Sequence, residues 1–197
     1  GVMKVGDDVM VAEATRSLVA VRPAAVVYAC TSGSFVRGVG GEQALVNAML
    51  AAGARRAVTT SGAAVAALRS LGVRRVGIAA PYVGEITERL VSFFAESGLE
   101  AVSCEFLGLD ESAEVVSGAE TIELIAAADR ADAEAVFVAC TNLETFDLIP
   151  EVEAKLGKPV LTANQVTMWG ALEAAGFSVP PLDPPQRLFA PAARLTR

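Results

Sequence analysis

The sequence VVYACTS at residues 26–32 has a close counterpart, VFVACTN, at residues 136–142. Each segment starts as an apolar run of strand length, ends in Cys-Thr and a polar residue, and precedes a helical pattern. At such a junction the first N–H groups of the helix are free and its positive dipole end favours an anion, which suits a reactive thiolate. The repeat therefore predicts two half-domains that face each other, each bearing one thiol, Cys30 or Cys140. Two thiols on opposite walls of a cleft are typical of a two-cysteine, cofactor-independent isomerase or racemase.

Strand patterns alternate with helix patterns along almost the whole chain, which predicts an α/β fold with parallel sheets. Apolar residues make up 53% of the sequence, as expected for strands that are covered on both faces. The expected strands are residues 24–29, 57–60, 75–80, 101–106, 135–139 and 160–162, and Pro81 is expected to end the third. The expected helices are residues 7–21, 42–52, 61–71, 84–97, 119–131, 145–156 and 165–175, with a loop at residues 107–117.

The two halves of the chain overlay as two pseudo-symmetric lobes with the active site in the cleft between them. We expect residues 1–72 to form the first lobe and residues 73–176 the second. Residues 177–197 are rich in proline and are expected to form an irregular tail. The overlay leaves the first lobe without a leading strand and helix, because nothing in it corresponds to residues 75–98 of the second. The first lobe is therefore predicted to be incomplete.

Composition excludes several kinds of site and partner. The chain has no histidine, which excludes Ser-His-Asp and Cys-His catalysis and histidine metal sites, and no C-x-x-C pair, so no metal site is expected. A net charge of −7 without a long run of like charges argues against a nucleic-acid or membrane partner. No apolar stretch reaches the roughly 18–20 residues of a membrane span, and no signal peptide is visible. Three cysteines without framework spacing favour reduced thiols and a cytoplasmic location.

Several short motifs together resemble one group of enzymes. They are CTSGSF at residues 30–35, TTS at 59–61, PYV at 81–83, ACTN at 139–142 and PVLTANQ at 159–165. In combination they resemble the maleate isomerase and arylmalonate decarboxylase branch of the aspartate/glutamate racemase superfamily, with the ectoine-utilisation racemase-like proteins as the most similar group. The resemblance spans residues 6–176. It implies two Rossmann-like lobes, a site between them and no cofactor.

The resemblance also implies roles for the two cysteines. In maleate isomerases one thiolate adds to the alkene, the C2–C3 bond rotates as a single bond, and elimination gives fumarate, while the other cysteine assists proton transfer. By this resemblance Cys30 is the nucleophile and Cys140 its partner. In racemases of the superfamily the two cysteines act as base and acid on opposite faces of one carbon.

The family's substrate contacts map onto residues that follow the strands in both lobes. Hydroxyl and backbone N–H groups are expected to bind the carboxylates, and an apolar residue is expected to line the side-chain pocket. The family's first-strand loop, which carries another binding residue, has no counterpart in this sequence. The implied substrate-binding residues are Thr31, Ser32, Tyr82, Val83, Thr141 and Asn142.

Other functions stay open at this point. Arylmalonate decarboxylases have glycine at the first cysteine position, so Cys30 favours an isomerase or racemase. The alternatives are a decarboxylase that uses Cys140 as proton donor and a non-catalytic protein that binds a small carboxylate. All of these functions imply a small carboxylate, and most simply a dicarboxylate, as the ligand. A homodimer is the expected assembly. Cys104 lacks the strand-end context and is expected to be structural.

Overall fold

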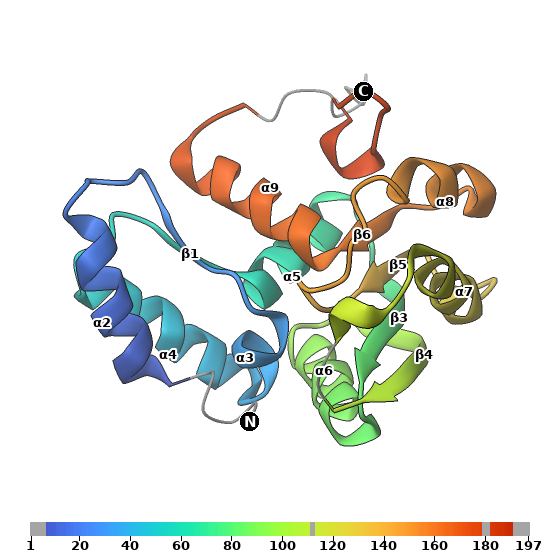
Figure 1. The fold of residues 1–197 in the computed structure, drawn as a ribbon, viewed down its shortest axis with the longest axis horizontal. Coiled ribbons are helices and arrows are strands. Elements are labelled where there is room, and N and C mark those ends of the chain that lie inside the picture. Colours follow the sequence, from blue (N-terminus) through green and yellow to red (C-terminus); the bar gives the residue numbers. More distant parts are fainter. Residues whose placement is uncertain (1–6, 111–112, 179–181, 191–197) are drawn as a thin grey trace.

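The structure, a computed structural model, describes residues 7–110, 113–178 and 182–190. Two parallel sheets lie at the centre of an α/β fold, as predicted (Figure 1). The smaller sheet pairs β1 (Val26–Tyr28) with β2 (Ala57–Thr59). The larger sheet has the order β4-β3-β5-β6 and consists of β3 (Arg75–Tyr82), β4 (Glu100–Leu109), β5 (Ala135–Val138) and β6 (Val160–Thr162).

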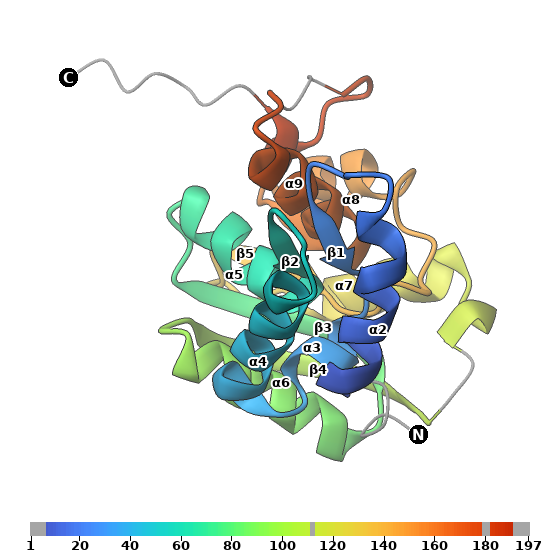
Figure 2. The ribbon, with the colours of Figure 1, turned by 90° about the vertical axis from the view of Figure 1, so that its left-hand side faces the viewer.

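Helices cover these strands on both faces. In the first half of the chain they are α2 (Asp8–Val19), α3 (Thr31–Phe35), α4 (Gly38–Ala51) and α5 (Thr60–Ser70). In the second half they are α6 (Gly84–Glu96), α7 (Gly118–Ala128), α8 (Ile149–Leu156) and α9 (Ala163–Ala175), with short 3-10 helices η1 (Ala113–Val115) and η2 (Arg187–Phe189). Figure 2 shows α2 and α4 side by side beside the small sheet, and these two helices also contact each other.

The two sheets repeat one local arrangement, which supports the predicted internal symmetry. In both, the strand that precedes a cysteine pairs with a later strand whose last threonine caps a helix. Thr59 accepts a hydrogen bond from an N–H in the first turn of α5, and Thr162 forms a capping box with Gln165 in α9. Within the described residues β1 has one strand neighbour, whereas its counterpart β5 has two, and this is the asymmetry that the sequence overlay predicts. The exact boundaries of the lobes stay a prediction.

The helices α5 and α9 join the two halves. The hydroxyls of Thr60 and Thr167 lie 2.8 Å apart and link the first turn of α5 to the middle of α9. Gly170 of α9 brings the two backbones close, because a Cβ there would lie 2.8 Å from the Cβ of Ala63 and 3.2 Å from Cγ1 of Val58. Small residues at this crossing therefore set the distance between the two sheets.

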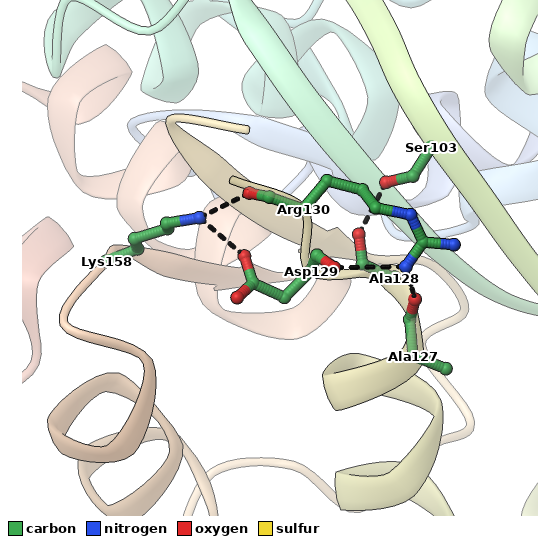
Figure 3. Close-up of polar contacts among 6 residues, drawn as sticks. All are labelled: Ser103, Ala127, Ala128, Asp129, Arg130 and Lys158. Carbon is green, nitrogen blue, oxygen red and sulfur yellow. Dashed lines mark hydrogen bonds and ion pairs between the residues drawn. The ribbon is translucent and has the colours of Figure 1, made fainter. Parts of the chain in front are cut away.

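Polar contacts fasten the second sheet at the amino ends of its strands. The ammonium group of Lys158 donates to the Asp129 carboxylate at 2.7 Å and to the Arg130 carbonyl at 2.5 Å (Figure 3). The Ser103 hydroxyl donates to the Ala128 carbonyl and ties β4 to the end of α7. This cluster is at the end of the sheet opposite to the one where Tyr82 ends β3 and Cys140 follows β5.

Several sequence-based boundaries were wrong, and the loop expected at residues 107–117 begins within β4, which runs to Leu109. The third strand continues past Pro81 to Tyr82, because the strand pairing shifts register between Ala80 and Tyr82 and a residue without an N–H is tolerated at such an irregularity. The helix expected from residue 145 starts at Ile149, where Pro150 occupies its first turn. In the first half, the helix expected from residue 42 starts at Gly38, as α4.

The C-terminal segment packs against the second sheet. Gln186 is buried and accepts a 2.8 Å hydrogen bond from the amide of Gln165, and its own amide donates to the Phe146 carbonyl at 3.2 Å. The carboxylate of Glu153 accepts the N–H groups of Val160 and Arg187 and so ties α8, β6 and η2 together. Residues 179–181 and 191–197 of the expected tail, and residues 111–112 of the expected loop, lie outside the described residues.

Candidate active site

Both predicted cysteines lie at the carboxyl end of a strand. Cys30 follows β1 and is the N-cap residue of α3, as the sequence predicted. Cys140 follows β5, but residues 141–148 form a turn instead of a helix, so the expectation of a helix N-terminus at Cys140 was wrong. Both side chains are partly buried and neither forms a disulfide. Both thiols are therefore available at the edge where α/β sheets bind ligands.

Tyr82, from the end of β3, brings the two thiols into one site. Burial raises the pKa of Tyr82 well above its ordinary value, and the negative charge of the Cys140 thiolate raises it further. A hydrogen bond to Cys140 and the charge of Cys30 act in the same direction, whereas the Thr31 hydroxyl opposes them. The phenol therefore stays protonated at neutral pH and can donate a hydrogen bond to a thiolate. Its ring also packs against Phe35 of α3, with the centroids 6.0 Å apart.

The hydroxyl of Thr31 has the properties of a ligand-binding group. Thr31 is only 1% exposed. Within the part of the chain that the structure describes, its Oγ1 atom has no hydrogen-bond partner of good geometry, although it lies near the Tyr82 phenol. A buried hydroxyl without a partner is costly, and a bound carboxylate would satisfy it. The neighbouring Ser32 hydroxyl lies 3.8 Å from the Cys30 sulfur.

Two further serines hold the Cys30–Thr31 backbone in place. The Ser34 hydroxyl donates to the Cys30 carbonyl at 2.7 Å and lies 2.7 Å from the Ser61 hydroxyl. Ser61, in the first turn of α5, donates to the Thr31 carbonyl at 3.1 Å. Sequence analysis placed Ser34 and Ser61 in the motifs but gave neither a part in the site. Their structural role is to fix the loop from which Thr31 and Cys30 project.

Cys140 has an unusual backbone. Its φ is 83°, in the left-handed region that costs a residue with a side chain about 1–2 kcal/mol. The flanking backbone is held on both sides, since the Ala139 N–H donates to the Ala79 carbonyl and the Asn164 amide donates to the Thr141 and Leu143 carbonyls. Strained conformations of this kind cluster at functional sites. Asn164 is thus a further residue of the site, and it was visible in the PVLTANQ motif without a role.

The remaining predicted site residues lie close by. Val83 is the N-cap residue of α6, directly after Tyr82, and is partly buried. Thr141 and Asn142 line a cavity of about 1040 Å³ between the loop after β5, α9 and the C-terminal segment. Neither cysteine lines this cavity, so it adjoins the site of the two thiols without containing it. The structure therefore brings Cys30, Thr31, Tyr82 and Cys140 together, with Thr141 and Asn142 at one side.

Cys104 lies outside this site, on β4. Burial raises the pKa of the Cys104 thiol to about 11, and the charges of Glu105 and Glu88 contribute to the rise. A thiol with a raised pKa is a poor nucleophile at neutral pH. The structural role expected for Cys104 agrees with these surroundings.

No group of three or more Cys, Asp or Glu side chains is placed to bind a metal ion in residues 7–110, 113–178 and 182–190. In the same part of the chain, each helix is too short or too polar to cross a bilayer.

Curated proteins similar in sequence to this chain include an arylmalonate decarboxylase and maleate isomerases. The arylmalonate decarboxylase of Bordetella bronchiseptica is 38% identical over 151 residues, which are 74% of this chain and 62% of that enzyme. The maleate isomerase of Geobacillus stearothermophilus is 28% identical over 125 residues, or 62% of this chain and 50% of the relative. The chain thus spans between half and about three fifths of the length of these relatives.

Solved structures of an arylmalonate decarboxylase and of a maleate isomerase have the same fold. A glycine-to-cysteine variant of arylmalonate decarboxylase with an associated sulfate ion superposes with a TM-score of 0.86 and 36% identity, over 96% of this chain and 82% of the variant. A Nocardia farcinica maleate cis-trans isomerase variant with a covalently bound succinylcysteine intermediate gives a TM-score of 0.83 at 22% identity, over 90% and 76% of the two chains. The second likeness concerns the fold alone.

The resemblance seen in the short motifs is confirmed by a match over most of the sequence. The family model described as arylmalonate decarboxylase matches residues 3–183, which include both cysteines and Tyr82. The matched relatives include both a decarboxylase and maleate isomerases. The chain therefore belongs to the arylmalonate decarboxylase family, in the branch of the aspartate/glutamate racemase superfamily that also contains the maleate isomerases.

Proposed function

We propose that this protein is a two-cysteine, cofactor-independent isomerase or racemase of a small carboxylate, with maleate-type cis–trans isomerisation as the leading reaction. The observation that carries the proposal is the position of Tyr82, whose phenol interacts with the Cys140 thiolate and also lies within the field of Cys30. The unpartnered Thr31 hydroxyl is the first candidate for binding a substrate carboxylate.

The isomerisation needs no external electron acceptor. The Cys30 thiolate forms an S–C bond to one alkene carbon, and the alkene electron pair moves to the neighbouring carbon, where the adjacent carboxylate stabilises it. The former double bond is now single and rotates. The electron pair then re-forms the alkene in the trans geometry while the S–C bond breaks and the thiolate is regenerated. Cys140 gives a proton to the carbanion carbon and takes it back before elimination.

A decarboxylase is the second candidate, because the arylmalonate decarboxylase is 38% identical to this chain. In that reaction the bond to one carboxylate breaks, carbon dioxide leaves, and the electron pair stays on the remaining enediolate. The Cys140 S–H then gives its proton to that carbon. Cys30 has no part in this sequence of steps, so Cys30→Gly should leave a decarboxylase active and should abolish an isomerase.

The test is a proton NMR time course of the protein with maleate, followed by a panel of disubstituted malonates and chiral amino acids. The wild type and the Cys104→Ala control should produce fumarate, and Cys30→Ala and Cys140→Ala should each lose nearly all of that turnover. Full turnover in both of the latter variants would exclude the two-thiol mechanism. Carbon dioxide loss from a malonate in Cys30→Gly would establish the decarboxylase. A protein that binds these acids without changing any of them would be a binding protein.

A further inference from the structure

We propose that Tyr28 is a positioning residue for Cys30, whose phenol donates a hydrogen bond to the Cys30 thiolate in a space that Gly33 leaves open. The importance of this contact for catalysis rests on the proposed function, but the contact itself can be tested without any substrate. Sequence analysis treated Tyr28 as one residue of a buried strand and gave it no role. The family resemblance did not place it among the binding residues either.

Backbone geometry puts the two side chains on the same side of the chain. Tyr28 is the last residue of β1, and Cys30 has an extended conformation with φ −142° and ψ 117°. Residues two apart in extended backbone project to the same face. Both side chains are partly buried, so neither is fully surrounded by water.

The surroundings of Gly33 locate the phenol oxygen. A Cβ added at Gly33 would overlap the Tyr28 hydroxyl, and it would lie 3.1 Å from Cζ of Tyr28 and 3.2 Å from Sγ of Cys30. The phenol oxygen of Tyr28 and the sulfur of Cys30 therefore both lie next to the point that a Cβ at position 33 would occupy. Gly33 is inside α3 and its φ is not left-handed, so space and not backbone conformation requires glycine here.

The electrostatics of Tyr28 agree with a donor role. Burial raises the pKa of Tyr28, and the charge of the Cys30 thiolate and the hydrogen bond to it raise the pKa further, while Arg37 has a smaller opposite effect. A phenol with a raised pKa keeps its proton at neutral pH and can only donate to a thiolate. The charge of Cys30 also acts on Tyr82 of β3. In a site without histidine, each thiol thus has one tyrosine donor, Tyr28 for Cys30 and Tyr82 for Cys140.

The hydrogen bond from Tyr28 would stabilise Cys30 in its reactive form. A hydrogen bond to an anionic sulfur stabilises the thiolate that must be present before addition and that is regenerated after elimination. Tyr28 is the last residue of β1, the strand that leads to Cys30, so it can hold the nucleophile from within its own segment of the chain. We expect its removal to lower the population of reactive Cys30 and to leave Cys140 unaffected.

The test measures the rate at which iodoacetamide alkylates each cysteine as a function of pH, with peptide mapping to resolve Cys30, Cys104 and Cys140. In Tyr28→Phe the pH midpoint of Cys30 alkylation should move upward, with about a tenfold lower rate below the midpoint, as expected for loss of a hydrogen bond to a charged group. Gly33→Ala should produce the same shift by displacing the phenol. The matched control is Gly40→Ala, since a Cβ at Gly40 would meet nothing within 4 Å.

The double variant decides whether the two residues act together. If Gly33 serves only to admit the phenol, adding Gly33→Ala to Tyr28→Phe should shift the Cys30 midpoint no further. An unchanged Cys30 midpoint in Tyr28→Phe would overturn the proposal, and full additivity would overturn the part assigned to Gly33. Because Tyr28→Phe preserves the shape of the side chain, its result stands even if Gly33→Ala does not fold. A shift in the midpoint of a protein that isomerises no acid would uphold this contact and refute the proposed function.

Discussion

Gly170 of α9 lies against Ala63 of α5 so closely that a Cβ at position 170 would be 2.8 Å from the Cβ of Ala63. Since α5 follows the strand that pairs with β1 and α9 follows the strand that pairs with β5, this crossing relates the Cys30 and Cys140 halves of the site. The spacing of the two thiols therefore depends on two small residues that lie away from the chemistry.

Gly170→Ala should lower the free energy of unfolding by about 1–3 kcal/mol through overpacking. The loss should occur even though alanine favours a helix over glycine by about 1 kcal/mol. Urea unfolding measures it, and Ala63→Gly in the same chain should restore part of the loss because it removes the opposing methyl group. Equal or greater stability in Gly170→Ala alone would show that the crossing is looser than the structure indicates.

Cys140 offers a direct test of stored backbone strain. Because its φ is 83°, glycine should fit this position better than any residue with a Cβ. We expect Cys140→Gly to be more stable than Cys140→Ala by about 1 kcal/mol, with both variants inactive in the proposed isomerisation. Thermal or urea unfolding of the pair provides the measurement. If alanine were the more stable of the two, the left-handed conformation would not be a source of strain in the protein.

The buried carboxyl group of Glu153 should make stability depend on pH. Burial raises the pKa of Glu153 above 4.5, although two backbone N–H groups and Arg187 oppose the rise. The folded state therefore binds this proton more tightly than the unfolded state, and the contribution of Glu153 to stability is present at low pH and decreases as pH rises through the raised pKa.

The measurement compares wild type with Glu153→Gln. The difference in unfolding free energy between wild type and Glu153→Gln should change in disfavour of the wild type as pH rises from about 4.5 through the raised pKa of Glu153, because the glutamine does not titrate. The exposed carboxylates Glu120 and Glu134 have lowered pKa values that affect both proteins alike, so they cancel in the difference. A difference that does not vary with pH would contradict the assignment.

Much of the fold followed from periodic patterns, since apolar strands and glycine-terminated helices are local signals. The two cysteines were also predictable, because the repeated strand–Cys–Thr segment marks equivalent places in two halves. The turn after Cys140 was not, since the helix expected from residue 145 starts only at Ile149, with Pro150 in its first turn. Tyr28 was missed because an aromatic residue in an apolar run is ordinarily part of the core, and only the open space over Gly33 shows where its phenol lies.

The most direct test of the central claim is a search for the covalent intermediate on Cys30. Cys140→Ser should be incubated with maleate, and each cysteine-containing peptide then weighed by mass spectrometry. In this variant water must supply the proton to the carbanion, and without a Cys140 thiolate to remove that proton again the elimination should stall. The account predicts one added maleate on the peptide that contains Cys30 and none on the peptide that contains Cys104. A wild type that converts maleate to fumarate while Cys30 in the variant remains unmodified would contradict the account.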